Sequence, residues 1–464
     1  MKVPEQIFRE YDIRGIVDED LTEELTHAVG RAYGSELLSA IARDAPGGIP
    51  GDLPRVAVGY DNRPSSPRLV DALIRGVTST GVNVLDLGVA PTPVTWWAEP
   101  TLGTHGAIQL TGSHNPPEWN GIKMTRLGRS LYGAGVQELM TRIQRDDFAS
   151  GEGTRQAIPV LDRYVEDLSG RFELKRPVKV VVDCGNGTGS VVAVRLLEAI
   201  GAEVIPLYCE SDGTFPNHHP DPTVDEFLVD MIELVRANGA DLGVAFDGDA
   251  DRIGAVDEKG RVIRGDILLL LFGLELLRRG GEGQLLIFDV KCSQVLPEVY
   301  EAAGGQALMW KTGHSLIKEK MKETGAPLAG ELSGHICFAD DYLGIDDALY
   351  AALRLIDLVD RTDAPLSAQV DTFPKYFSTP EIRIEVTEET KVRVVSAAME
   401  HFGKSHEVLD VDGARILFGD GWALLRSSNT QPVIVARFEA RTPERLAEIR
   451  SEVERWLREQ GVNV

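Results

Sequence analysis

Val178-Lys-Val-Val-Val-Asp183 is a run of mostly β-branched residues, and Gly185-Asn-Gly-Thr-Gly189 follows it almost at once. The run predicts a buried strand, the glycines predict a tight turn, and Val191–Ile200 predicts a helix. A strand, a turn and a helix in this order are typical of α/β proteins. A dinucleotide-binding fold is disfavoured, because the spacing is G-x-G-x-G and Ser190 stands where the third glycine belongs.

The same alternation of short apolar runs and helix-length segments recurs along the first 370 residues. Upstream, it predicts a helix over Pro67–Thr80 and strands at Val56–Asp61, Val82–Gly88 and Ala107–Thr111. Downstream, it predicts strands at Val204–Leu207, Leu242–Phe246, Leu285–Asp289 and Ala307–Lys311. A hairpin of Ile253–Asp257 and Arg261–Arg264 is expected to open a third region, before a helix capped by Asp266. The plan repeats, but no residue-level repeat is evident.

After about residue 370 the pattern changes to an α+β module. Helices are predicted at Glu388–Phe402 and Pro443–Gln460, and strands at Ile382–Val386, Arg415–Leu417, Ala423–Leu425 and Val433–Glu439. The fold class is therefore α/β, with three similar α/β domains and a C-terminal α+β domain. We expect the domains to span residues 1–150, 151–256, 257–370 and 371–464; the polar, glycine-bearing segment Glu152–Ala157 supports the first boundary.

Composition excludes several classes of protein. The 464 residues are 43% hydrophobic and 26% charged, so the chain is not disordered throughout. The 72 acidic and 48 basic residues give a net charge of -24, which disfavours nucleic acid and anionic membranes as partners. The four cysteines have no zinc-ligand spacing and indicate buried thiols in a reducing compartment. With no apolar run of bilayer length and no signal peptide in Met1–Arg14, we expect a cytoplasmic protein.

The most informative motif is Asp247-Gly-Asp-Ala-Asp-Arg252, which follows the predicted strand Leu242–Phe246. Ligands of α/β proteins lie at the carboxyl ends of strands. If the segment is extended, its three carboxylates share one side and repel, by about 4 kcal/mol for two charges 4 Å apart at a dielectric constant of 20. A divalent cation removes that cost, and oxygen ligands favour Mg²⁺.

Two other structures are compatible with an acidic motif of this length. A solvated acidic turn is one, although the placement after an apolar strand disfavours it. An EF-hand is the other, since Glu258 matches its last ligand. That alternative fails because Arg252 occupies the position that requires glycine and because strands, not helices, flank the motif.

A second motif, Thr111-Gly-Ser-His-Asn-Pro-Pro117, ends the strand Ala107–Thr111 and predicts a rigid, exposed loop. Ser113 is a candidate nucleophile or phosphate carrier, with His114 beside it. Lys123, ten residues beyond, is a candidate cation or acid–base group. Taken alone, an ordinary turn and a surface lysine explain these residues equally well.

Three further segments carry polar groups suited to phosphates or sugars. Arg426-Ser-Ser-Asn-Thr-Gln-Pro432 offers hydroxyls, an amide and a guanidinium to a phosphate, although a plain turn is as good an account. Gly330-Glu-Leu-Ser-Gly-His335 offers a carboxylate and a hydroxyl to sugar hydroxyls. In Lys311-Thr-Gly-His314, the histidine begins a predicted helix as a ligand contact or as a neighbour of the cap.

Together these segments resemble the α-D-phosphohexomutase superfamily, most closely its bacterial phosphomannomutase/phosphoglucomutase group. Phe8-Arg-Glu-Tyr-Asp-Ile-Arg-Gly15 resembles the N-terminal motif of that family. The segments at 111–116, 247–252, 330–335 and 426–432 resemble its phosphoserine, metal, sugar and phosphate loops, in the family's order along the whole chain. The resemblance implies four domains with mixed sheets around a central cleft.

The resemblance also implies a role for each matching residue. Ser113 would carry the phosphoryl group and, with Asp247, Asp249 and Asp251, hold Mg²⁺. The reacting end would be lined by Arg14, His114, Lys123, Arg252, His314 and His335. Glu331 and Ser333 would contact sugar hydroxyls, and Tyr11 and Lys291 match cleft positions. The non-reacting phosphate would be held by Arg426, Ser428, Asn429, Thr430 and Arg437.

The function so implied is interconversion of hexose 1-phosphate and hexose 6-phosphate, of mannose or glucose, through a hexose 1,6-bisphosphate. Lys123, His314 and His335 are the candidates for general base. Two positions depart from the family pattern: Leu332 replaces methionine, and Trp119 replaces a tyrosine. The alternatives are a phosphoglucosamine mutase, a non-catalytic phosphosugar-binding relative and a Mg²⁺-dependent phosphatase. The partner is expected to be a phosphosugar, and the chain a monomer or dimer.

Overall fold

The computed structural model describes residues 3–44, 54–428 and 431–464. The chain divides into two units. The first comprises Met1–Leu268 with Ser333–Gln369, and the second Leu269–Leu332 with Val370–Val464. Each unit contains sheets with helices packed on them, and helix α8 (Gly265–Gly280) carries the chain from the first unit into the second.

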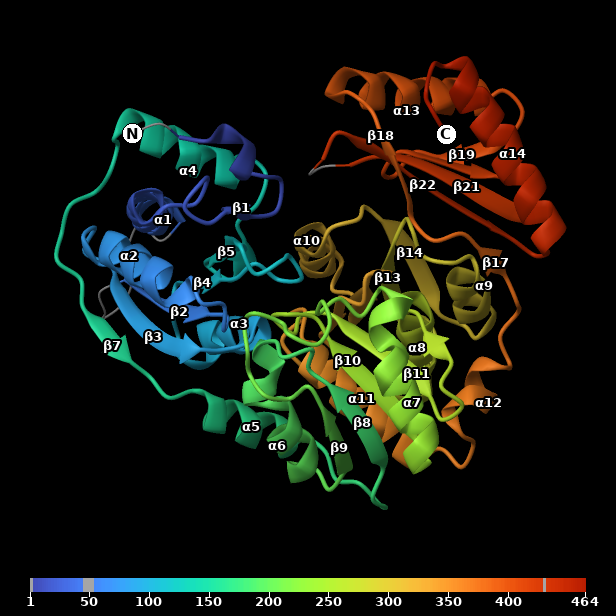
Figure 1. Ribbon diagram of the computed structural model, residues 1–464, viewed down its shortest axis with the longest axis horizontal. Helices are drawn as coiled ribbons and strands as arrows, with labels where there is room; N and C mark the ends of the chain where they lie inside the picture. The colour runs from blue at the N-terminus through green and yellow to red at the C-terminus, as the bar shows by residue number, and fades with distance from the viewer. Residues whose placement is uncertain (1–2, 45–53, 429–430) are drawn as a thin grey trace. The chain divides into compact units, whose positions relative to one another are not determined.

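The first unit begins with a seven-stranded mixed sheet. Along the sheet the strands are β1 (Ile13–Ile16), β5 (Trp119–Arg126), β4 (Gly106–Leu110), β2 (Arg55–Tyr60), β3 (Asn83–Val89) and β7 (Arg155–Ala157), with β6 (Arg129–Ser130) on β5. β2 is parallel to β3 and β4, whereas β5 is antiparallel to both of its neighbours, β1 and β4. The helices are α1 (Glu23–Asp44), α2 (Ser66–Thr78), α3 (Thr92–Thr101) and α4 (Ala134–Arg145), and α1 packs along α2 (Figure 1).

The second sheet, also in the first unit, is mixed as well. Its order is β12 (Val262–Ile263), β11 (Ile253–Asp257), β10 (Leu242–Phe246), β8 (Lys179–Asp183) and β9 (Glu203–Leu207). Its helices are α5 (Leu161–Ser169), α6 (Ala193–Ala199) and α7 (Val229–Asn238). The hairpin β11–β12 was expected to open the third region, but β11 pairs antiparallel with β10 along its whole length and so completes the second sheet.

The first unit also contains β16 (Ile336–Phe338), α11 (Ala348–Arg361) and α12 (Leu366–Val370). Asp347 caps α11 by accepting a hydrogen bond from Tyr350 N at 2.9 Å. Its buried carboxylate also accepts the hydroxyls of Tyr164 and Tyr342, at 2.8 and 2.7 Å. Burial outweighs the three donors and raises the pKa of Asp347 to about 6.

Asp347→Asn should therefore change how stability depends on pH. Because the pKa of Asp347 is higher in the folded state, near 6, than its ordinary 3.8, its stabilising contribution is complete below the lower value and is lost as pH rises through the higher. Asparagine caps helices equally well and does not titrate. Relative to the wild type, the variant should gain about 1–2 kcal/mol of unfolding free energy between about pH 5 and pH 7.5. Urea unfolding at both pH values measures this, and a difference independent of pH would contradict it.

The second unit contains parallel strands β13 (Leu285–Asp289), β14 (Gln306–Trp310) and β15 (Leu328–Gly330) with helices α9 (Val295–Ala302) and α10 (His314–Thr324). It also contains an antiparallel sheet of β17 (Phe377–Ser378), β18 (Ile382–Glu385), β19 (Glu407–Leu409), β20 (Ala414–Leu417), β21 (Gly421–Ser427) and β22 (Val433–Ala440). Helices α13 (Glu388–Phe402) and α14 (Pro443–Glu459) pack on this sheet (Figure 1). Alternation along β21 turns Ala423 and Leu425 toward these helices and Trp422 and Leu424 toward Val290.

A buried aspartate lies at the carboxyl end of one central strand in each α/β domain. These are Asp61 after β2, Asp183 ending β8 and Asp289 ending β13. Asp61 accepts the backbone N–H of Gly112, and Asp289 that of Leu332, both at 3.0 Å. Each donor lies two residues beyond the end of the neighbouring parallel strand, so the two carboxylates hold equivalent loops. This is a residue-level repeat that the sequence pattern did not disclose.

The predicted fold class is confirmed, with α/β sheets followed by an α+β module. All four cysteines are free thiols, and Cys209 is only partly buried, with its Sγ 3.2 Å from that of Cys184. In the portion of the chain that the structure describes, none of the helices has both the length and the hydropathy of a membrane span.

Candidate active site

Three buried carboxylates meet in the turn between β10 and β11. Asp247, Asp249 and Asp251 are each 0% exposed, and one oxygen of each lies within 4.8 Å of the others. The segment is a turn, not the extended chain that was expected, because Asp247 Oδ1 accepts the N–H groups of Asp251 and Arg252 at 3.1 Å. Ala250 takes a φ of +59° within this turn. The turn brings the carboxylates together more closely than alternation along a strand would.

Each carboxylate of this cluster is held by neighbouring groups. Lys123 Nζ donates to Asp249 Oδ2 at 2.7 Å and to Asp251 Oδ2 at 2.5 Å. Thr92 donates its hydroxyl to the same oxygen of Asp249 and its N–H to the Asp249 carbonyl. Hydrogen bonds from Lys123 and Thr92, both residues of the first unit, therefore hold the carboxylates of Asp249 and Asp251 in place.

The donor set fits a divalent cation. Asp249 Oδ1 is buried and has no hydrogen-bond partner among the described residues. Asp251 Oδ1 lies 3.3 Å from His335 Nε2. A buried oxygen without a donor is costly unless a ligand satisfies it, and carboxylate oxygens are the ligands of hard cations. The acidic cluster is therefore able to bind a metal ion.

Asp247→Asn should stabilise the metal-free protein. Burial, together with Asp251 and Asp249, raises the pKa of Asp247 well above its ordinary value, so its charge opposes folding at neutral pH. The amide keeps the acceptor for the two N–H groups and removes one of the repelling charges. We expect about 1–2 kcal/mol of added unfolding free energy in EDTA at pH 7.

Asp257→Asn is the matched control for this prediction. Asp257 is also buried, but it accepts bonds from Lys259 N and Arg261 N, both at 2.9 Å, and from Arg261 Nε at 2.6 Å. Its neutralisation should lower the unfolding free energy by about 1 kcal/mol or more. If both substitutions lowered the unfolding free energy, repulsion among the three carboxylates would not be destabilising the folded protein.

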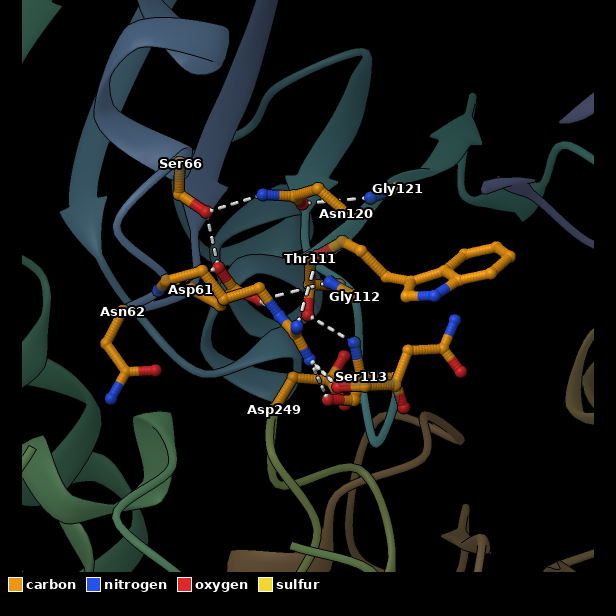
Figure 2. Close-up of polar contacts among 12 residues, drawn as sticks. Asp61, Asn62, Ser66, Thr111, Gly112, Ser113, Asn120, Gly121 and Asp249 are labelled. Carbon is orange, nitrogen blue, oxygen red and sulfur yellow. Dashed lines mark hydrogen bonds and ion pairs between the residues drawn. The ribbon is translucent and has the colours of Figure 1, made fainter. Parts of the chain in front are cut away.

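The serine loop runs from the end of β4 to the start of β5. It contacts the turn that carries the three aspartates, residues 247–252, which we call the metal turn. Ser113 donates its hydroxyl to Asp247 Oδ2 at 2.9 Å. Gly248 lies against it: a Cβ there would be 2.3 Å from the carbonyl oxygen of Ser113, so no side chain fits. The loop was expected to be exposed, but Ser113 is only 1% exposed because the metal turn covers it. Figure 2 shows Ser113 beside Asp249.

His114, beside the serine, is neutral, whereas Lys123, beside the aspartates, is positively charged. His114 Nδ1 lies 3.1 Å from Ser113 Oγ. Burial, with help from Arg252 and Arg14, lowers the pKa of His114 well below its ordinary value and keeps the ring neutral at pH 7. Burial opposes the charge of Lys123, but Asp249 and Asp251 outweigh it and raise its pKa. Lys123 is a buried residue of β5 and not a surface lysine.

The remaining predicted residues of the first unit form two small groups. His335 accepts from Arg252 Nε at 3.4 Å through Nε2, and its Nδ1 lies 3.0 Å from Ser333 Oγ. Arg14 is fixed by Asp12 through a 2.7 Å ion pair, and Tyr11 lies partly exposed in the same N-terminal motif. Ser113, His114, Lys123, Arg252, His335 and the three aspartates thus form one connected site.

In the second unit, three predicted residues lie beyond the ends of β13, β14 and β15, two of them on loops and one at the start of a helix. Lys291 follows β13 and pairs with Glu381 at 3.3 Å. Glu331 follows β15 and accepts the N–H of Gly313 at 2.6 Å. His314 is the first residue of α10, directly after that glycine. The contact between Glu331 and Gly313 therefore joins the sugar loop to the start of α10.

The predicted phosphate loop follows β21 in the same unit. Arg426 donates Nε to Asp412 Oδ2 at 2.5 Å, which holds its guanidinium. The carbonyl of Ser428 accepts Lys391 Nζ at 2.8 Å. Arg437 is buried and donates to the carbonyl of Lys291 at 2.6 Å, so it contacts the loop that follows β13. Asn429 and Thr430 lie outside the described residues.

Sequence reasoning missed the residues that hold these loops. Asp61 and Arg63 bind the serine loop, Thr92 binds the metal turn, and Asp289 and Asp412 bind loops of the second unit. The one available signal was position: Asp61 and Asp289 end predicted apolar strands, where α/β sheets gather their functional loops. Nothing in the spacing pointed to Arg63 or Thr92.

Four family profiles match successive parts of the chain. They are described as phosphoglucomutase/phosphomannomutase alpha/beta/alpha domain I (residues 5–150), domain II (162–260) and domain III (264–376), and as the C-terminal domain (381–455). A phosphomannomutase/phosphoglucomutase of Pseudomonas aeruginosa is 46% identical over 451 residues, covering 97% of this chain and 95% of that protein. A phosphoglucomutase of Neisseria gonorrhoeae is 40% identical over 454 residues, covering 97% and 96%.

A solved structure gives the same result. The crystal structure of a phosphoglucomutase/phosphomannomutase family protein from Burkholderia thailandensis matches with a TM-score of 0.92 and 42% identity. The match covers all of this chain and 99% of that one. Sequence and structure thus point to the same family over the full length of the chain.

Proposed function

Because the chain belongs to the phosphoglucomutase/phosphomannomutase family, we propose that it is a phosphohexomutase that interconverts the 1-phosphates and 6-phosphates of mannose and glucose. One observation carries the proposal beyond family membership. The hydroxyl of Ser113 lies 2.9 Å from Asp247, in an acidic cluster that retains a buried oxygen without a donor. A phosphoryl carrier beside a cation site is what this reaction requires.

Ser113 would carry the phosphoryl group in the resting enzyme. In the first step, its Oγ–P bond breaks while a bond forms between phosphorus and a free hydroxyl of the sugar phosphate. The hydroxyl proton goes to a base, for which His314 and His335 are the candidates. Lys123 was a third candidate, but Asp249 and Asp251 raise its pKa and keep it protonated, so it does not accept the proton. The product is a hexose 1,6-bisphosphate, which then returns its other phosphoryl group to Ser113 Oγ. In this second step the bond between phosphorus and the sugar oxygen breaks, and the base returns its proton to that oxygen, so that both the phosphoserine and the base are regenerated.

Cations would offset the charge of the phosphoserine. Asp247, Asp249 and Asp251, with a phosphoserine oxygen, would hold Mg²⁺, and when bound Mg²⁺ neutralises charge on the transferring phosphoryl group. Lys123 and Arg252 lie beside the cluster as permanent charges. Arg14 is a third cation of the site, and its charge helps to lower the pKa of His114. Several fixed cations are needed before a second phosphate can approach a dianionic phosphoserine.

The second unit would supply recognition of the substrate. Arg426, Ser428, Asn429 and Thr430 would bind the phosphate that does not react, and Glu331 would accept sugar hydroxyls. Ser333, a residue of the first unit, would also contact sugar hydroxyls. The ion pair of Arg426 with Asp412 supports this role, because it orients a guanidinium near the loop. The bond from Arg437 to the Lys291 carbonyl supports a role in holding Lys291.

A coupled assay tests the proposed function. With Mg²⁺ and a trace of glucose 1,6-bisphosphate, mannose 1-phosphate and glucose 1-phosphate should both be converted to their 6-phosphates at comparable rates. Conversion of one alone would retain the mutase and reject dual specificity. Conversion of glucosamine phosphate alone would favour a phosphoglucosamine mutase. Release of inorganic phosphate without isomerisation would refute the mutase and indicate a phosphatase.

A further inference from the structure

Arg63 is a buried cation whose side chain donates its hydrogen bonds to the protein backbone and to one carboxylate. It follows β2, and its side chain is 1% exposed. Through NH2 it donates to the carbonyls of Ser113 and Asn115, at 2.8 and 2.6 Å. Through NH1 it donates to the carbonyls of Trp119, at 3.1 Å, and Pro116. One guanidinium therefore binds four carbonyls of the serine loop.

The charge of Arg63 is neutralised by Asp61. Arg63 Nε donates to Asp61 Oδ2 at 2.9 Å, and that carboxylate also accepts the N–H of Gly112 at 3.0 Å. Figure 2 shows Asp61 between Ser66 and Gly112. The pair therefore binds the loop from two sides, with donors on the carbonyls and an acceptor on the N–H before Ser113.

Arg63 is also closed off from solvent on its outer side. The ring of Phe215 lies 5.0 Å from its guanidinium carbon. A Cβ on Gly213 would come within 2.2 Å of the carbonyl of Asn62, so this backbone packs directly on the residue before Arg63. A group enclosed in this way does not touch a sugar phosphate, and its effect on the reaction must pass through the serine loop.

The conformation of Ser113 is the feature that needs this support. Its φ is +50°, in the left-handed region that non-glycine residues avoid. Its N–H is held by Thr111 Oγ1 at 2.9 Å, and its carbonyl is held by Arg63. With both peptide groups fixed, the side chain points at Asp247. Without Arg63, one of the two restraints is lost and the residue is free to relax to negative φ.

We infer that Arg63, with Asp61, is a positioning residue that holds Ser113 in its left-handed conformation and so aligns the hydroxyl for phosphoryl transfer. The inference rests on the proposed function of Ser113 as the carrier. It assigns Arg63 no contact with substrate or metal. The reaction should therefore depend on Arg63 through the transfer step and not through binding of the sugar phosphate.

Arg63→Lys and Arg63→Ala test this assignment. Lysine keeps the charge but has one nitrogen in place of three, so it cannot bind four carbonyls and Asp61 together. We expect kcat, and the rate at which Ser113 takes up phosphate from glucose 1,6-bisphosphate, to fall by about 10²-fold, with KM nearly unchanged. Phosphate uptake is read by intact mass. For Arg63→Ala, guanidinium ion at millimolar concentration should restore part of the lost rate, because it can occupy the vacated space.

Arg354→Lys is the matched control, because Arg354 is also buried and paired, with both NH groups 3.0 Å from Asp340. It should lower the melting temperature and leave kcat unchanged. A kcat of Arg63→Lys equal to that of the wild type would overturn the positioning role. A rise in KM alone, or no guanidinium rescue, would do the same. If wild-type Ser113 itself takes up no phosphate, the proposed function fails and the inference fails with it, a result that the wild type alone reveals.

Discussion

Ser113→Ala should reduce mutase turnover by at least about 10³-fold. The substitution removes the hydroxyl oxygen that lies 2.9 Å from Asp247, on a residue whose N–H and carbonyl are both held by hydrogen bonds. Binding of glucose 1-phosphate should persist, since the groups proposed to bind phosphate and sugar are untouched.

Two measurements separate turnover from binding. The coupled assay gives kcat, and isothermal titration with glucose 1-phosphate gives the dissociation constant. Ser39→Ala is the control, because the Ser39 hydroxyl donates to the carbonyl of Ser35 in α1 and accepts from Arg142 of α4, neither of which is a candidate site residue. The control should retain wild-type turnover. Substantial activity in Ser113→Ala would remove the serine from the mechanism.

Asp249→Asn should lower activity by about 10²-fold or more and abolish the stabilisation of the protein by Mg²⁺. Asp249 Oδ1 is buried without a donor, while Oδ2 is occupied by Lys123 and Thr92, so the free oxygen is the one available to a cation. A cation that binds only the folded state at about 100 times its Kd stabilises it by about 2.7 kcal/mol. The variant should lose most of that gain.

Thermal unfolding with and without Mg²⁺ measures this effect directly, without any substrate. Asp266→Asn provides a control, since Asp266 is buried in the first turn of α8 and binds Ile267 N at 2.9 Å. The control should keep the full Mg²⁺-dependent shift. An unchanged shift in Asp249→Asn would place the cation elsewhere.

The elements that sequence predicted best are those whose ends are marked by polar residues. β10 was predicted with its observed bounds because an apolar run stops at Asp247. α13 was predicted with its observed bounds because Thr387 caps it and the apolar residues recur at helical spacing. The strand β11 was also predicted with its observed bounds, but its pairing with β10 was not, because local sequence marks where a strand ends and not which strand lies beside it.

The long helix α1 was missed although its signal was present. Leu25, Val29, Tyr33 and Leu37 recur every four residues and are all buried. Glycines between them reduced the apparent helix propensity. Gly30 explains their use: a Cβ there would lie 2.3 Å from the carbonyl of Leu73 on α2, so the two helices cross where no side chain fits.

The reactive residues of the candidate site were predictable from sequence, but the residues that position its loops were not. Ser113 and the three aspartates belong to motifs that follow apolar strands. Arg63 does not, because its partners lie 50 to 56 residues further along the chain and are backbone carbonyls, which any residue supplies. A contact between one side chain and a distant backbone leaves no trace in composition, periodicity or spacing.

The repeated aspartate at the strand ends has an evolutionary consequence. Asp61, Asp183 and Asp289 lie at the carboxyl ends of central strands in three α/β domains. Asp61 and Asp289 hold the loop that follows a neighbouring strand, whereas Asp183 accepts the N–H of Gly185 in the turn after its own strand. A duplicated ancestral domain that kept this residue would keep the attachment of its loop, whatever residues the loop acquired. Innovation could then proceed in one loop at a time without loss of the fold. Attachment through one backbone N–H, as at Asp61 and Asp289, sets no requirement on the other side chains of the loop.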